Sequence, residues 1–515
     1  MRSVLLIDRR PTRGHSRYGM TTTAIIVACL VLSTPGAVEA LDRDSRGRPN
    51  ILLIFTDDQS RRSVGCYEDA HPWVSTPNID RLAAEGVRFR DAYVGTWCLP
   101  SRAMMLTGLH PHGIRGIEVE RNPISKYDPG MFRFWPEELR KAGYHTAMIG
   151  KWHLSPDAGH GRAWDHSIVW NHAMPKEAGG YYRNQKLNFD GGPYRAVGGY
   201  STDNYTRYAV DYLRRDHQKP WFLWLCYDAV HGPYTAAGRH EDCYRADEPV
   251  PTPEDIYPPR PTKPRYMQQY GVWKPGEGGV PVSGKKTLPE AVRQYNRAVR
   301  ALDEGVGKLL ETLEETGQLD NTLVVYTSDQ GFAWGQHGFA WKVAPYDANL
   351  RAPLIVRMPG RVAQGKVCRR PVCALDLVPT FFALAGVEPP WKMHGHDLRP
   401  LLENPEGDWP YPVVMEQFGW AFGPETDGAL TGEKTLGVPW YVFLRQGRYK
   451  YIRTLVEDEI EELYDLEADP EELENLALDP AHRHVLADYR ARLVEELRRT
   501  GAVFADRLPE PKENR

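Results

Sequence analysis

The sequence is poor in cysteine, and it lacks both an excess of basic residues and a long apolar run. Its 515 residues contain 7 cysteines, and no two of them form a Cys-x-x-Cys pair, which argues against a zinc site built from thiolates. The formal net charge is -4, so no basic surface points to nucleic acid as a partner. The apolar run from Ala24 to Leu32 is too short for a convincing membrane span.

The first 40 residues predict a secretory signal peptide. Arginines from Arg9 to Arg17 precede the apolar run, and Ala37 to Ala40 offers a small-residue cleavage site. We expect cleavage after Ala40 and a mature protein in the periplasm or outside the cell, without a stable membrane span. An uncleaved signal anchor is the alternative. The segment ending at Cys29 loosely resembles a lipoprotein box, but the apolar run continues past it.

Apolar runs alternate with amphipathic segments along the chain. Ile51 to Phe55 is continuously apolar and predicts a strand buried on both faces. Further strands are expected at Thr146–Ile149, Trp221–Tyr227, Leu323–Tyr326 and Leu354–Val356, and helices at Asn78–Gly86, Pro136–Gly143 and Pro289–Gly317. The alternation predicts an α/β fold in which helices cover both faces of a large, mostly parallel sheet.

Polar clusters follow these strands. Ligands of such sheets bind outside the carboxyl ends of the strands, so we expect one crevice to gather Asp57, Asp58, Lys151, His153, His231, Asp329 and Gln330. Residues 155–199 and 233–289 are rich in Gly, Pro, Tyr and Trp and predict long loops that shape this site. Within the first loop, the side chains of Trp164, His166, Trp170, His172 and Tyr181 suit a carbohydrate, unless they pack on one another.

A short helix is expected to begin beside Cys98. Pro100 suits a first helical turn and Gly108 can end the helix, which places Cys98 where free amides favour negative charge. A lone cysteine at such a position is usually a buried structural residue. Two of the other cysteines, Cys368 and Cys373, are close enough in the sequence to pair if a turn brings them together.

The stretch Cys98-x-Pro100-Ser101-Arg102, followed by Thr107-Gly108, resembles the signature of type I sulfatases, in which a dedicated enzyme oxidises the cysteine to Cα-formylglycine. The stretch from Gly143 to Leu154 resembles the second signature of that family. The resemblance implies an alkaline-phosphatase-like fold. Its catalytic domain would span residues 49–405 and its C-terminal subdomain, a small antiparallel sheet with a helix near Val485–Arg499, residues 406–505. Arg445 to Arg453 reads as a hairpin at the edge of that sheet, and residues 506–515 as a loose tail.

The resemblance also implies roles for individual residues. The metal ligands would be Asp57, Asp58, Asp329, Gln330 and the modified Cys98. Oxygen ligands suit Ca²⁺, or Mg²⁺, rather than zinc, and without a cation the pKa of each acid should rise. Arg102 would hold the hydrated aldehyde and His153 would hydrogen-bond its second hydroxyl, while the sulfate would be gripped by Lys151, His231 and Lys342. His231 would also protonate the leaving oxygen, and His337 is the alternative to Lys342.

The predicted function is hydrolysis of a sulfate monoester, on a carbohydrate, by an exported enzyme that also depends on a formylglycine-generating partner. One hydroxyl of the hydrated aldehyde attacks sulfur and the other collapses to expel sulfate, a route that a serine ester lacks. Two alternatives stay open. One is a phosphonate monoester or phosphodiester hydrolase of the same fold, and the other is a carbohydrate-binding relative that has lost catalysis.

Overall fold

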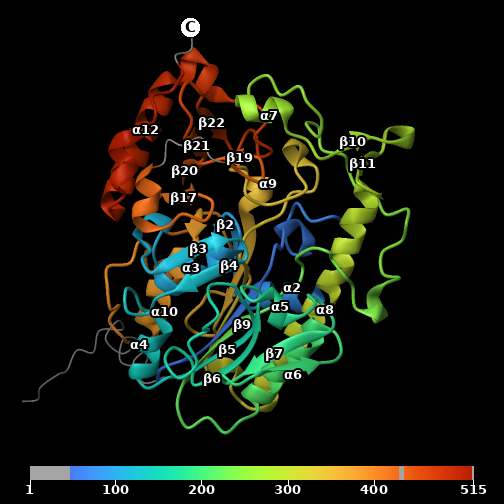
Figure 1. The fold of residues 1–515 in the computed structure, drawn as a ribbon, viewed down its shortest axis with the longest axis vertical. Coiled ribbons are helices and arrows are strands. Elements are labelled where there is room, and N and C mark those ends of the chain that lie inside the picture. Colours follow the sequence, from blue (N-terminus) through green and yellow to red (C-terminus); the bar gives the residue numbers. More distant parts are fainter. Residues whose placement is uncertain (1–46, 429–433, 513–515) are drawn as a thin grey trace, which may run out of the picture. The chain divides into compact units, whose positions relative to one another are not determined.

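The computed structural model describes residues 47 to 428 and 434 to 512 (Figure 1). The predicted signal peptide and Cys29 lie outside these ranges. The chain from Arg48 onward is one unit built around a sheet of 11 strands. Among the described residues, no helix combines the length and the apolar character needed to cross a membrane.

The centre of this sheet is parallel. The five central strands, in spatial order, are β13 (Thr322–Ser328), β1 (Asn50–Thr56), β9 (Trp221–Cys226), β5 (His145–Trp152) and β6 (His166–Asn171). Beyond β13 lie the antiparallel strands β14 (Arg351–Arg357) and β2 (Val87–Tyr93), and β2 also pairs with β15 (Lys366–Cys368) and β16 (Val372–Cys373). Beyond β6 lie β7 (Gln185–Phe189) and β8 (Tyr194–Val197), both antiparallel.

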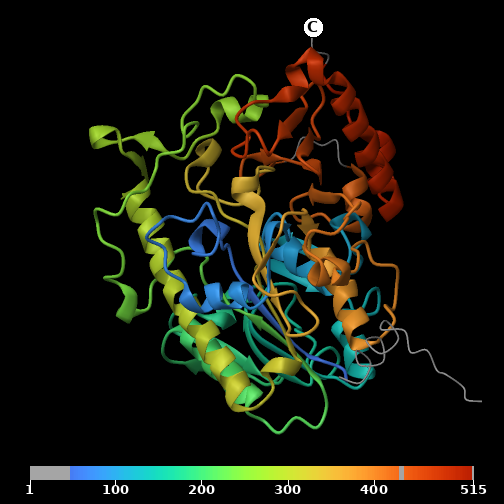
Figure 2. The same ribbon diagram turned by 180° about the vertical axis from the view of Figure 1, so that it is seen from behind.

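Helices bury both faces of the sheet. Along β1, Ile51, Leu53 and Phe55 join one hydrophobic core, whereas Leu52 and Ile54 join another, as the period of two along a strand requires. Residues of α3 (Cys98–Thr107) and α10 (Leu377–Ala385) belong to the first core. The second core is covered by α2 (Pro77–Ala84), α6 (Ser201–Leu213) and α8 (Leu288–Glu315), and Figure 2 shows the same layers from behind. The predicted α/β architecture is confirmed.

A second, smaller sheet follows near the C-terminus. It has the order β17 (Val413–Gln417), β20 (Tyr441–Gln446), β21 (Tyr449–Thr454) and β22 (Glu462–Asp465), all antiparallel. Residues of α12 (Arg483–Thr500) pack on one face of it. The predicted hairpin is present as β20 and β21, but it occupies the middle of the sheet rather than its edge.

Several local expectations were wrong. Residues 155–199 are not one long loop, because β6, β7 and β8 extend the central sheet there. Residues 233–289 contain α7 (Arg265–Gln269) and a small sheet of β10 (Lys274–Pro275), β11 (Pro281–Ser283) and β12 (Lys286–Thr287). Residues 506–512 are not loose, since Asp506 pairs with Arg498 at 2.6 Å and the Lys512 amide donates to the Glu459 carbonyl at 3.0 Å.

The proposed pair of Cys368 and Cys373 is also wrong, because both thiols are free. The two residues lie on strands that run in the same direction along β2, opposite Phe89 and Tyr93. Four residues along a strand span about 13 Å. That separation is beyond the reach of a disulfide.

Candidate functional site

Acidic residues at the ends of β1 and β13 meet the N-terminus of α3. Thr56 and Ser328 are paired positions on these parallel strands, so the residues that follow, Asp57-Asp58 and Asp329-Gln330, emerge side by side. One oxygen of each aspartate and the Cys98 sulfur all lie within 4.8 Å of one another. All of these side chains are buried. The predicted convergence at the carboxyl ends of the parallel strands is therefore present, and it places the acids beside Cys98.

The backbone at Asp58 aims both adjacent carboxylates at this cluster. Asp58 has φ of 59°, a left-handed conformation that aspartate tolerates better than most residues, whereas an extended backbone would send neighbouring side chains to opposite faces. The Asp58 amide donates to Asp329 Oδ1 at 2.9 Å. The Tyr295 hydroxyl donates to the Asp58 carbonyl at 2.6 Å and accepts from the Ser60 amide at 2.7 Å, which fixes the turn.

The helix at Cys98 is as predicted. It spans Cys98–Thr107, and Gly108 closes it with φ of 69°, its amide bonded to the Met104 carbonyl at 2.8 Å. The Cys98 sulfur lies 3.2 Å from Asp57 Oδ1 and 3.0 Å from Lys342 Nζ. Burial and the neighbouring Asp57 raise the pKa of the thiol well above its usual value. The unmodified side chain is therefore not prepared to act as a thiolate.

Three cations balance the three acids. Lys151 donates to Asp57 and, at 2.8 Å, to the Tyr181 hydroxyl. Lys342 Nζ lies 2.6 and 2.8 Å from the two oxygens of Asp58. Arg102 pairs with Asp329 at 3.2 Å and donates to the Lys151 carbonyl at 2.9 Å.

This balance corrects the expectation that the pKa of every acid rises. Burial and the nearby Asp57 do raise the pKa of Asp329 well above its usual value. Burial also acts to raise the pKa of Asp57, but Lys151 and His231 outweigh it and hold that pKa well below the usual value. The prediction is confirmed for Asp329 and wrong for Asp57, because a charge pair opposes desolvation there.

The donor set fits a hard divalent cation. Three carboxylates lie close together and supply oxygen ligands, which suit Ca²⁺ or Mg²⁺ better than zinc. His231 forms a second, smaller group with Asp57 and Cys98. The Gln330 amide nitrogen donates to Asp58 Oδ1. Half a turn of that amide would bring its oxygen, the atom that a cation needs, into the same position.

A cavity of about 410 Å³ opens above Cys98. Its inner lining includes Cys98, Asp58, Lys342 and the imidazoles of His153, His172 and His231. The remaining predicted residues are buried and do not line the cavity. Asp57, Asp329 and Gln330 contact the lining residues Cys98 or Asp58. Lys151 and Arg102 lie one contact further in, bonded to Asp57 and Asp329 respectively. His337 lies elsewhere, with Nδ1 2.5 Å from Asp255 Oδ2, so Lys342 and not His337 reaches the site.

Two histidines that line this cavity each have one ring nitrogen that makes no hydrogen bond. His231 Nδ1 lies 2.9 Å from the Gly232 carbonyl; since a carbonyl only accepts, Nδ1 carries the proton and Nε2, 3.7 Å from Asp58 Oδ2, is left open. Burial and Lys342 lower the pKa of His231 to about 4. His153 Nε2 lies 3.3 Å from Asn122 Oδ1, whereas its buried Nδ1 has no hydrogen-bond partner. Burial and His172 lower the pKa of His153 well below its usual value.

The aromatic residues proposed to face a carbohydrate divide into two groups. Trp164 and Trp170 are buried in the two cores, and His166 bonds to Asp190 at 2.9 Å, so these three pack against other residues. His172 lines the cavity. Tyr181 lies behind His231, with the two rings stacked at 4.6 Å between centroids.

Sequence reasoning missed the residues at the mouth of the cavity: Asn122, Trp341, Trp420, Lys434 and Leu436. Asn122 turns between β3 (Ile117–Arg121) and β4 (Ile124–Tyr127). Trp341 and Trp420 lie in connections of the C-terminal half, Lys434 lies on β18 (Lys434–Thr435), and Leu436 is in the turn between β18 and β19 (Val438–Pro439). None of them follows a strand of the parallel sheet. The indole of Trp420 is 45% exposed, but it can be assigned to the cavity only when the fold is known.

Comparison with known proteins agrees with this geometry. The Sulfatase family model matches residues 49–387, and the model for the C-terminal part of N-sulphoglucosamine sulphohydrolase matches residues 335–499. The N-acetylglucosamine-6-O-sulfatase of Bacteroides thetaiotaomicron is 29% identical, over 92% of this chain and 89% of its own. The arylsulfatase of Clostridium perfringens is 26% identical, over 87% and 94%. A solved structure in complex with its substrate, D-glucosamine-2-N,6-O-disulfate, superposes with a TM-score of 0.74 at 27% identity, over 88% of this chain and 98% of its own.

Proposed function

The chain belongs to the sulfatase family and is an enzyme, and from this premise we propose that it hydrolyses a sulfate monoester on a carbohydrate. One observation carries the proposal. At the floor of a cavity, the side chain of Cys98 lies 3.2 Å from an aspartate of a three-acid cluster and 3.0 Å from a lysine ammonium. One sulfate group could thus contact Cys98 as the position of the nucleophile, a cation held by the three acids, and the ammonium group of Lys342.

Oxidation of Cys98 to Cα-formylglycine supplies the nucleophile in this proposal. The hydrated aldehyde offers one hydroxyl for attack on sulfur and a second through which sulfate is expelled. Asp57, Asp58, Asp329 and Gln330 would hold Ca²⁺, with Mg²⁺ as the other candidate. Such a cation neutralises charge on the sulfate oxygens and lowers the pKa of an adjacent hydroxyl.

The chain's own residues bind the sulfate and move the protons. Lys342 lines the cavity beside Cys98 and grips the sulfate, while Lys151 adds positive charge from beneath through its contact with Asp57. Arg102 is fixed by Asp329 and the Lys151 carbonyl and holds the residue at position 98. Lys151 and Arg102 are buried and Lys342 is 11% exposed, and each is fixed by an ion pair, so these groups are already ordered when the substrate arrives.

The two histidines have different roles in this scheme. His231 presents Nε2 to the cavity and protonates the leaving oxygen. The low pKa of His231 applies to the site without substrate. A bound sulfate ester brings negative charge close to the ring, which favours the imidazolium form and raises this pKa. The unpartnered Nδ1 of His153 is available to the second hydroxyl at position 98.

A carbohydrate fits the mouth of the cavity. Trp341 and Trp420 present exposed indoles there, and aromatic faces suit the apolar face of a sugar ring. The N-acetylglucosamine-6-O-sulfatase relative points to the same substrate class. Because Trp420 and Leu436 follow the boundary near residue 405, the proposed subdomain of residues 406–505 forms part of the substrate wall. Export to the periplasm or beyond remains part of the proposal.

The test combines mass spectrometry with a substrate panel. In a host that has the modifying enzyme, the peptide containing Cys98 should be lighter than its encoded mass, and Cys98→Ser should fold but turn over at most once per site. Cys66→Ser, in a cysteine outside the site, is the matched control and should keep full activity. Active enzyme that carries only the unmodified thiol refutes the mechanism.

The substrate panel tests the two alternative functions. Faster turnover of a phosphonate monoester than of any sulfated sugar or aryl sulfate would assign the protein to the phosphonate hydrolases instead. If modified, cation-loaded protein turns over none of these esters, it is a binding protein without catalysis.

A further inference from the structure

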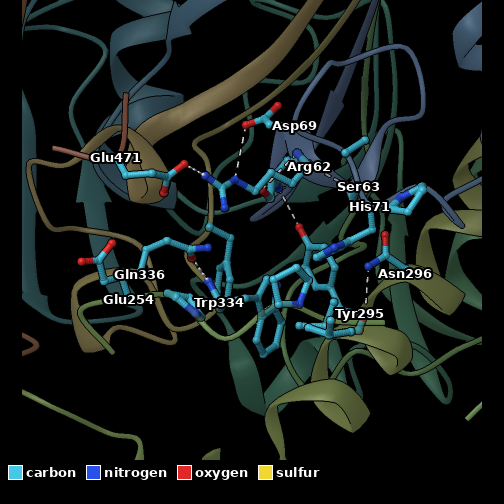
Figure 3. Close-up of a pocket in the computed structure, with 18 of the residues that line it drawn as sticks. Arg62, Ser63, Asp69, His71, Glu254, Tyr295, Asn296, Trp334, Gln336 and Glu471 are labelled. Atoms are coloured by element: carbon cyan, nitrogen blue, oxygen red, sulfur yellow. Dashed lines mark hydrogen bonds and ion pairs between the residues drawn. The ribbon is translucent and has the colours of Figure 1, made fainter. Parts of the chain in front are cut away.

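A second cavity, of about 360 Å³, lies on the other side of Tyr295 from the acid cluster. Figure 3 shows the aromatic side chains of Tyr295 and Trp334 along one side of it and the charged side chains of Arg62, Asp69 and Glu471 along the other. Phe332 adds a third aromatic ring to the lining. None of the residues to which we assign a catalytic or metal-binding role lines this cavity.

The lining leaves buried polar atoms without partners. Asn296, on α8, is 2% exposed. Its amide nitrogen donates to the Val292 carbonyl at 2.9 Å, whereas its Oδ1 accepts no hydrogen bond. The indole Nε1 of Trp334 is also buried without a partner, and so is Asp69 Oδ1. Such atoms are rare in folded proteins, and here they supply one donor and two acceptors to the same space.

The charge of the lining is negative. Four carboxylates contribute to it, those of Asp69, Glu254, Asp255 and Glu471, against the single guanidinium of Arg62. That guanidinium is already paired, at 2.6 Å with Glu471 and at 3.3 Å with Asp69. Burial and Arg62 lower the pKa of His71 to about 4, so His71 adds no charge at neutral pH. Asp69 also pairs with Arg61, just outside the lining, at 2.9 Å, so the unbalanced negative charge comes from Glu254 and Asp255. That charge disfavours sulfate and carboxylate groups and favours a cation.

The remaining lining decides which kind of cation fits. Val250, Pro253 and Val292 are apolar, and together with three aromatic rings they leave too few oxygen atoms to replace the hydration shell of a metal ion. Aromatic faces and carboxylates together favour an organic ammonium group. The unpaired Trp334 Nε1 adds a donor that an ammonium ion cannot use but a hydroxyl oxygen can.

We propose that this cavity binds a small hydroxylated organic ammonium ion, of the size of an amino sugar. Asn296 Oδ1 and Asp69 accept from the ammonium group, the aromatic rings cover the carbon skeleton, and Trp334 Nε1 donates to a hydroxyl. The volume lies within the usual range for small-molecule sites. This site shares Phe332 with the lining of the sulfate ester cavity but none of the residues assigned to hydrolysis, and it does not depend on the proposed hydrolysis.

The experiment is calorimetric titration of the full-length protein with glucosamine, at a mildly acidic pH that keeps the amine protonated. N-acetylglucosamine is the matched probe, because it keeps the ring and hydroxyls but loses the charge. Glucosamine should bind about tenfold or more tightly than the acetylated sugar, the difference typical of a charged hydrogen bond. Equal affinities, or no binding of glucosamine, overturn the proposal.

Variants locate the binding and separate it from the other cavity. Asn296→Ala removes the unpaired acceptor, and Glu254→Gln removes one charge at an exposed rim position; each should weaken glucosamine binding several-fold while turnover of an aryl sulfate stays unchanged. Asn122→Ala, in the sulfate ester cavity, should leave the affinity for glucosamine as it was. Loss of binding in Asn122→Ala but not in Asn296→Ala would place the sugar in the other cavity and refute the assignment. Displacement of glucosamine by calcium chloride alone would show a metal site instead.

Discussion

The floor and the mouth of the sulfate ester cavity are built in different ways. The base of the floor consists of side chains that are at most 2% exposed, such as Asp57, Asp329 and Cys98, with His231 above them at 27%. It is held by the ends of paired strands and the start of a helix. At the mouth, Trp341, Trp420 and Leu436 are 40%, 45% and 53% exposed, and they stand on separate connections. The floor has the order that electrostatic catalysis needs, while the mouth can vary without disturbing the sheet. We therefore assign the reaction to the floor and the choice of substrate to the mouth.

The largest effect is expected at the floor when the cation is removed. Chelation should abolish turnover and lower the melting temperature, because a ligand that binds only the folded state stabilises it. Added calcium should restore both. Asp329→Asn should be inactive and should show no further loss of melting temperature on chelation, whereas Asp320→Asn, at a highly exposed side chain, should behave as wild type. Full activity of metal-free enzyme would mean that the three acids have another purpose.

A smaller effect, also at the floor, is expected for His231→Ala. General acid catalysis is worth about 10²- to 10⁴-fold, or roughly 3 to 5 kcal/mol of barrier. The loss should grow with the pKa of the leaving alcohol, so it should be greatest for a sugar sulfate and least for the sulfate of an acidic phenol. Rates of wild type and variant on a graded series of sulfate esters provide the measurement. A uniform loss across the series would show that His231 grips the sulfate and that the proton comes from another group.

The smallest effect is expected at the mouth. Trp420→Ala should raise KM for a sulfated sugar by about threefold to tenfold, the loss of about 0.5–1.5 kcal/mol that an aromatic contact contributes, with kcat unchanged. Small aryl sulfates should be affected less. The control is Tyr411→Ala, which removes another exposed aromatic ring, 40% accessible and outside the cavity lining. A large fall in kcat in Trp420→Ala would show that the mouth also contributes to the reaction, against the division proposed above.

The same division explains what the sequence predicted. Asp57, Asp58, Asp329, Gln330 and His231 follow apolar strands, and strand ends of a parallel sheet meet at one edge, so their convergence follows from a local pattern. The role of Lys342 rests on the family resemblance, because no strand precedes it. Asn122 and Trp420 reach the mouth through tertiary packing of segments that are far apart in the sequence. Local hydrophobic periodicity does not predict such contacts.

The strands β7 and β8 were missed for a related reason. Each combines buried or half-buried positions with exposed ones, and both lie at the margin of the sheet. Marginal strands carry polar residues and lack the continuous apolar run that marks a strand covered on both faces. The loop prediction for residues 155–199 therefore failed at these exposed strands, and it also missed β6, which is buried along its whole length.

The burial of Cys98 sets an order of events in the life of each molecule. The thiol is 2% exposed, and all ten residues of its helix are buried, so another enzyme has no access to this segment once the sheet and helices have closed around it. If Cys98 is the residue that is oxidised, the oxidation must precede folding, while the chain is still being made or carried out of the cell. A molecule that folds first keeps its thiol for its lifetime. The active fraction of a preparation would then depend on the rate of oxidation relative to the rate of folding during biosynthesis. Later exposure of the purified, folded protein to the modifying enzyme would not restore activity.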